Sequence, residues 1–114
     1  MSCGCERFML GYLQVVTVVG SKEDAERISL LVVEKRLAAC SQVLGPLTSI
    51  YWWNGKIERA EEWMCIMKSR DETYQELEST IRQNHPYEIP EIQALPVARG
   101  NKSYLEWLES ELVR

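Results

Sequence analysis

Thr48-Ser-Ile-Tyr-Trp-Trp-Asn-Gly-Lys-Ile57 encodes a β-hairpin, because β-branched and aromatic residues lead directly into an Asn-Gly pair. This pair is preferred in two-residue type I′ turns, where both central residues need positive φ. Such a turn fixes the strand register, so Trp53 should face Lys56 and Trp52 should face Ile57. We therefore expect a long hairpin, whose outgoing strand starts near Cys40 and whose returning strand ends near Ser69.

The tip of this hairpin is apolar on both faces. The register puts Tyr51 and Trp53 on one face and Trp52, Ile50 and Ile57 on the other. Each aromatic side chain buries ~150–250 Å² when it packs, and at ~25 cal/mol per Å² covering three of them is worth several kcal/mol. Exposed patches of this kind mark partner surfaces. We interpret Tyr51, Trp52, Trp53 and Ile57 as an oligomer interface. The alternative is a hairpin that bends over its own domain.

The rest of the chain alternates strand and helix patterns. The first half predicts a strand over 11–19, a helix from the capping box Ser21–Asp24 to near Ala38, and a strand from Cys40 to Trp53 that is interrupted at Gly45-Pro46. The second half begins with the returning strand of the hairpin, followed by a helix that Asp71 caps and Pro86 ends. A strand over 91–97 and a final helix capped by Asn101 complete the chain. The order βαββαβ plus a C-terminal helix predicts an α+β fold of the ferredoxin-like type. Residues 11–114 would form one domain behind a tail of residues 1–10.

Composition excludes several classes of function. The 114 residues are 46% apolar and 26% charged, and the net charge of −4 argues against a general nucleic-acid binder. No Lys or Arg run favours a membrane surface, and no apolar stretch approaches the ~20 residues that span a bilayer. Met1 to Arg7 lacks the pattern of a signal peptide. We therefore expect a cytoplasmic protein with no membrane or nucleic-acid partner.

Four cysteines are expected to be thiols in a reducing compartment. Cys3 and Cys5 could bind a soft metal, but two thiolates alone do not complete the four-ligand shell of structural zinc. We interpret them as part of a tail without an assigned role. Cys40 and Cys65 lie in apolar strand contexts, which favours small core residues.

Several segments together resemble the CutA family of divalent-cation tolerance proteins, over about Val15 to Leu112. The resemblance is carried, in order, by Lys35-Arg-Leu-Ala-Ala-Cys40, Thr48 to Ile57, His85-Pro-Tyr-Glu-Ile-Pro-Glu-Ile92, Leu95-Pro-Val97 and Tyr104-Leu-Glu-Trp-Leu108. It implies a ferredoxin-like protomer and a tight homotrimer, shaped like the trimers of the nitrogen-regulatory PII signalling proteins. It also implies a link to tolerance of copper and other divalent metals.

His85, the single histidine of the chain, is the candidate metal ligand. Imidazole suits copper, zinc and nickel, and the end of a helix favours its cationic form. The alternative is that His85 caps the helix and orients the turn that follows. Some bacterial members of the family that the chain resembles carry a cysteine and a further histidine, which by alignment are Thr17 and Asn84 here. We therefore expect weak binding of Cu(II) or another divalent cation at His85, to which a trimer could add carboxylates such as Glu88 and Glu91.

Three other groups of residues have a structural and a functional interpretation. Glu58, Glu61 and Glu62 could form a carboxylate cluster, but a solvated strand face is the simpler interpretation. The segment 99–101 could hold an anion at a helix N-terminus, or serve as a loop with a cap. We interpret Trp63 and Trp107 as core or interface residues.

The predicted function is a non-enzymatic homotrimer linked to divalent metal, and in particular copper, tolerance. The alternative is a PII-like signalling or adaptor trimer that binds a small ligand or a protein partner in clefts between its subunits. No phosphate-binding loop, zinc protease motif or nucleophile elbow is present, so an enzyme is the weakest interpretation.

Overall fold

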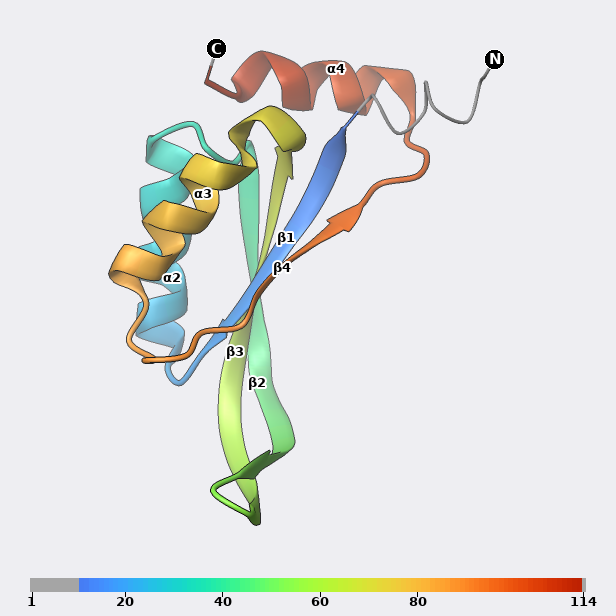
Figure 1. Ribbon diagram of the computed structural model, residues 1–114. Helices are drawn as coiled ribbons and strands as arrows, with labels where there is room; N and C mark the ends of the chain where they lie inside the picture. The colour runs from blue at the N-terminus through green and yellow to red at the C-terminus, as the bar shows by residue number, and fades with distance from the viewer. Residues whose placement is uncertain (1–10, 114) are drawn as a thin grey trace.

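A four-stranded antiparallel sheet with the strand order β2-β3-β1-β4 forms the centre of the computed structural model, which describes residues 11–113 (Figure 1). Helices α2 and α3 lie side by side against one face of the sheet, and α4 crosses its upper end. The elements are β1 (Tyr12–Val19), α2 (Lys22–Glu34), β2 (Cys40–Trp53), β3 (Lys56–Arg70), α3 (Asp71–Asn84), β4 (Ile92–Pro96) and α4 (Lys102–Glu111). The predicted tail with Cys3 and Cys5 lies outside the described residues. No helix that the structure describes is long and apolar enough to cross a membrane.

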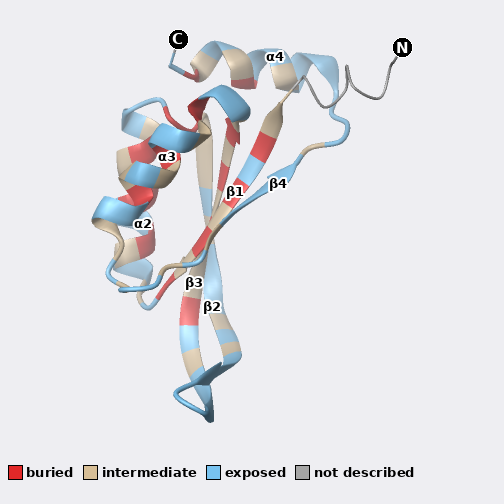
Figure 2. Ribbon diagram, in the orientation of Figure 1, coloured by how far each residue is buried: buried red, intermediate tan, exposed pale blue. Residues whose placement is uncertain are grey.

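The core lies between the sheet and the pair α2 and α3 (Figure 2). Alternate residues of β1 point into it, and the two helices contribute apolar residues at helical spacing. Its fully buried members include Val15, Val19, Ile28, Val32, Cys65, Met67, Leu77 and Ile81. Cys65 is therefore a core residue as predicted, and burial raises the pKa of its thiol. Cys40 is only half-buried, and Trp63 packs against the edge of the core.

The opposite face of the sheet is covered by neither α2 nor α3. The register places Val16 and Val18 of β1 beside Ile66 and Met64 of β3 on this face, and all four are half-buried in the protomer. Leu44 of β2 and Leu95 of β4 are exposed on either side of them. We call these six residues the open face.

The hairpin of β2 and β3 has the predicted turn and register. Asn54 and Gly55 have φ values of 51° and 76°, and Trp52 pairs with Ile57. The expected interruption at Gly45-Pro46 is also present, as a shift of register between Leu44 and Leu47. The hairpin projects away from the helices (Figure 1), which makes the molecule 49 Å long and 22 Å thick. The alternative that the hairpin bends back and buries its rings is wrong for the protomer, where Trp52 is 71% exposed.

Helix α2 ends at Glu34, and the prediction that it continues to near Ala38 was wrong. Arg36 takes a φ of 59°, the Arg36 N–H donates to the carbonyl of Val33, and the Leu37 N–H donates to that of Val32. This is a Schellman ending with arginine at the position that glycine usually occupies. The sequence contains no glycine there to mark the end of the helix.

Helix caps were predicted with mixed success. The Ser21 hydroxyl accepts from the Asp24 N–H at 3.1 Å, as the capping box predicts. Asp71 was predicted to cap α3, but Arg70 is the N-cap and Asp71 is the first helical residue. Asn101 is the N-cap of α4, although its side chain makes no capping hydrogen bond.

Candidate functional site

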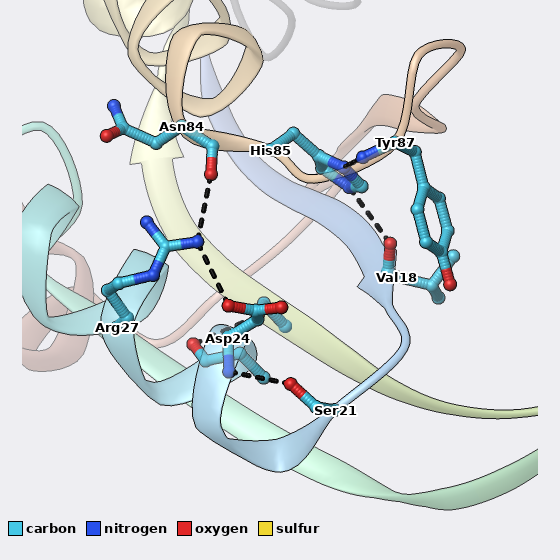
Figure 3. A network of polar contacts seen from close by, with 9 residues as sticks. Val18, Ser21, Asp24, Arg27, Asn84, His85 and Tyr87 are labelled. Carbon is cyan, nitrogen blue, oxygen red and sulfur yellow. Dashed lines mark hydrogen bonds and ion pairs between the residues drawn. The ribbon is translucent and has the colours of Figure 1, made fainter.

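His85 follows the last residue of α3 and uses both of its ring nitrogens within the fold. Nδ1 accepts a hydrogen bond from the Tyr87 N–H at 3.0 Å. Nε2 therefore carries the proton, and it donates to the Val18 carbonyl at 2.9 Å, with the Thr17 hydroxyl 3.1 Å away (Figure 3). The ring is thus held in one neutral tautomer, and it ties the end of α3 to the end of β1.

The surroundings of His85 favour this neutral form. Burial lowers the pKa of His85, and the hydrogen bond to Val18 and the carboxylates of Asp24 and Glu62 oppose that effect only in part. A neutral imidazole is the form that binds metals, but a metal at either nitrogen would displace a hydrogen bond seen here. Within residues 11–113, no three His, Cys, Asp or Glu side chains are grouped so that they could hold a metal ion. Metal binding at His85 stays a prediction.

The two residues that replace expected ligands lie differently with respect to His85. Thr17 is fully buried and its hydroxyl faces the imidazole. The side chain of Asn84 turns back along α3 and donates to the Thr80 carbonyl at 2.8 Å, away from the ring (Figure 3). The Asn84 carbonyl accepts from Arg27 at 3.1 Å. The fold therefore brings two of the three positions together and leaves the Asn84 side chain out.

Glu62 is buried, and its interpretation as part of a solvated strand face was wrong. Only 7% of the residue is exposed, and its Oε2 accepts a hydrogen bond from the Tyr87 hydroxyl at 2.7 Å. Burial, and then this contact with Glu62, raise the pKa of Tyr87. Glu58 and Glu61 are exposed, as expected. Glu62 differs because the loop between α3 and β4 brings Tyr87 against it, which no pattern within β3 could indicate.

A cleft of about 610 Å³ opens beside this Tyr87–Glu62 contact. Its walls come from the hairpin, from the end of β1 and from the loop after α3, and they consist of Val18, Ser49, Ile50, Tyr51, Trp53, Glu62, Tyr87, Glu88, Ile89 and Glu91. Two of the predicted interface residues, Tyr51 and Trp53, line the cleft, whereas Trp52 and Ile57 do not. The cleft thus joins aromatic rings and carboxylates that are far apart in the sequence.

A smaller hollow of about 240 Å³ lies at the start of α4 and includes the predicted anion-binding loop. Arg99 and Gly100 line it together with Lys68 and Tyr104. Leu105 packs closely against Gly100. The described residues show no buried polar group in this lining that would mark it as an anion site.

Comparisons with known proteins agree on one family. The model of the CutA1 divalent ion tolerance proteins matches residues 13–111. The divalent-cation tolerance protein CutA of Thermus thermophilus is 42% identical over 82% of this chain and 91% of its own, and that of Archaeoglobus fulgidus is 43% identical over 78% and 86%. The crystal structure of CutA1 from Oryza sativa superposes with a TM-score of 0.88 at 34% identity, over 90% of this chain and 94% of that one. The chain therefore belongs to the CutA1 family of divalent ion tolerance proteins.

Proposed function

We propose that the protein is a non-enzymatic homotrimer that acts in tolerance of divalent metal ions, copper in particular, and that it binds such ions weakly in the cytoplasm. The family name supports the link to divalent cations. The observation that carries the trimer is the exposed apolar surface of the protomer, which is concentrated on the hairpin and on the open face. In this proposal the protomer is ferredoxin-like and the trimer resembles those of PII proteins.

Two surfaces of the protomer support assembly. Trp52, Ile57 and Trp53 are 71%, 62% and 50% exposed on the hairpin. The open face adds apolar side chains on the side of the sheet that α2 and α3 leave free. Exposed apolar surface of this extent on a small protein indicates a partner, and a closed ring of copies would also cover the edge strands β2 and β4.

The assembly is tested by measuring mass in solution. Sedimentation equilibrium at micromolar concentration should give three times the mass of the 13.2 kDa chain. A monomer under these conditions would contradict the proposal.

The metal site is proposed at His85, with the Thr17 hydroxyl beside the ring and carboxylates from elsewhere in the trimer. Binding should be weak, because a metal must displace either the Tyr87 N–H or the Val18 carbonyl from the ring. Calorimetric titration with Cu(II) should give saturable heat for the wild type and much less for His85→Ala. Asn84→Ala is the matched control, because the Asn84 side chain turns away from the ring. Equal heats for wild type and His85→Ala would rule out this site.

The absence of enzymatic activity is proposed from the same contacts. A general base needs a nitrogen or oxygen that is free to take a proton from a substrate. The only histidine of the chain uses Nδ1 and Nε2 to hold the Tyr87 turn and the end of β1. Neither ring nitrogen of His85 is therefore free to act as a general base in this fold.

A further inference from the structure

The cleft beside Tyr87 contains a buried negative charge without a neighbouring cation. Glu62 accepts one hydrogen bond, from the Tyr87 hydroxyl. Across residues 11–113, none of the ion pairs involves Glu62, and its second carboxylate oxygen has no hydrogen-bond partner. A carboxylate withdrawn from water is unfavourable unless cations or several donors compensate its charge. One phenolic donor compensates it only in part, so the cleft favours a cationic occupant.

The walls of the cleft favour the same charge. Tyr51, Trp53 and Tyr87 contribute aromatic rings, whose faces attract cations. Glu88 and Glu91 are exposed at the rim, and the lining contains no Lys or Arg. A cation that enters this cleft is therefore surrounded by carboxylates and aromatic side chains, and no described residue of the lining carries a positive charge.

The size of the cleft separates an organic cation from a metal ion. Its volume of about 610 Å³ lies within the range of roughly 300–1,000 Å³ that is usual for small-molecule sites. Its carboxylates do not form a metal site with three ligands, since no group of three acidic, cysteine or histidine side chains is placed to hold a metal ion in the described part of the chain. A bare ion would lack a full set of ligands, whereas an organic molecule could place its charge at Glu62 and its carbon atoms against the aromatic side chains.

We propose that this cleft binds a small organic ammonium ion, with the charged nitrogen at Glu62 and the apolar part against Tyr51 and Trp53. The site does not use the ring nitrogens of His85 that are proposed to bind metal, although Val18 and Tyr87 contact His85 and also line the cleft. Tyr51 and Trp53 are also assigned to the subunit interface, so a neighbouring copy would form an additional wall of the cleft. Binding must therefore be measured on the protein as it assembles in solution.

Calorimetry with phenethylammonium tests the proposal, because this ion combines one primary ammonium group with one apolar ring. Neutral phenethyl alcohol is the matched ligand, since it has nearly the same shape without the charge. We expect saturable binding of the ammonium ion and an affinity about tenfold or more lower for the alcohol, because a hydrogen bond to a charged group is the stronger kind. Equal affinities, or no binding of the ammonium ion to the folded protein, would overturn the proposal.

Variants locate the site. Glu62→Gln keeps the size of the side chain and an oxygen for the Tyr87 hydroxyl, and it should weaken binding of the ammonium ion by about tenfold or more. Glu58→Gln changes an exposed carboxylate of the same strand that lies outside the cleft and should leave binding unchanged. Trp53→Ala removes a half-exposed ring and should also weaken binding. Unchanged affinity in both Glu62→Gln and Trp53→Ala would refute the site.

The mass of each sample separates this inference from the proposed assembly. A trimer that does not bind phenethylammonium contradicts the cleft proposal alone. A monomer that binds it through Glu62 contradicts the assembly alone.

Discussion

Tyr87 is the residue that connects three parts of the fold. Its N–H is held by His85, its hydroxyl is held by Glu62 of β3, and the hydroxyl also lies against Gly20, where an added Cβ would be 3.3 Å from the oxygen. These contacts fix the loop after α3 over the end of the sheet. Tyr87 forms one wall of the cleft, and its position therefore depends on its hydrogen bonds with His85 and Glu62.

Tyr87→Phe should lower the free energy of unfolding by about 1–3 kcal/mol, because Glu62 would remain buried without its donor. Urea denaturation monitored by tryptophan fluorescence measures the change. Tyr104→Phe is the control, because Tyr104 is 36% exposed and its contact with Trp107 is between the rings. Equal stability of the Tyr87 variant and the wild type would show that the Tyr87–Glu62 contact contributes nothing.

His85 should make stability depend on pH in mildly acidic solution. Burial places the pKa of His85 below its ordinary value of 6.5 in the folded state, so the unfolded chain takes up the proton first as pH falls. The stabilisation that the neutral ring contributes to the folded state is complete above pH 6.5. This stabilisation decreases as pH falls from 6.5 to the lower pKa of His85 in the folded state.

The measurement compares wild type with His85→Gln by denaturation at several pH values, with a chelator present. The wild type should lose more stability than the variant between neutral and mildly acidic pH. Parallel curves for the two proteins would show that the pKa of His85 is not lowered by folding. Asp24, Arg27 and Glu62 act on His85 and are present in both proteins, so the comparison isolates the ring.

At the scale of the elements, the β2–β3 hairpin depends on two residues with positive φ. Asn54 is the one that is not glycine, and its φ of 51° is accessible to asparagine but unfavourable for β-branched residues. Asn54→Val should destabilise the protein by about 1–2 kcal/mol, and Asn54→Gly should be nearly neutral. Thermal denaturation of the two variants checks this. Equal melting temperatures for the valine and glycine variants would show that the turn does not constrain the hairpin.

The elements also show what could be predicted from the sequence and why the rest could not. The Asn-Gly turn determines the pairing of β2 with β3, so local chemistry was sufficient for the hairpin. The end of α2 was missed because Arg36 takes a conformation that is usually marked by glycine. The burial of Glu62 was missed because it depends on Tyr87, 25 residues further along the chain. Long-range contacts between a loop and a strand leave no pattern in either segment.

At the scale of the whole molecule, the hairpin should determine the oligomeric state. The double variant Trp52→Ser and Ile57→Ser removes apolar surface from one face of the hairpin, and it should shift the protein towards monomers at micromolar concentration. Leu30→Ser is the control, because Leu30 is 59% exposed on α2, in the helix layer on the other side of the sheet from the open face. Sedimentation gives the mass of each variant. A double variant with the mass of the wild type would contradict the assignment of this face to the interface.

The register shift at Gly45-Pro46 sets the phase of the outgoing strand. Between Leu44, which pairs with Met64, and Leu47, which pairs with Glu62, β2 advances by three residues while β3 advances by two. The single extra residue lets odd-numbered residues after it share the sheet face that even-numbered residues occupy before it, so Tyr51 and Trp53 lie on the same side of the sheet as Leu44. Deleting Pro46 would return the strand to strict alternation. Tyr51 and Trp53 would keep their places, because the Asn54-Gly55 turn fixes the pairs from Leu47 onward. The extra residue therefore lets two registers coexist in one strand, the one set at the turn and the one set by the pairing of Leu44 with Met64.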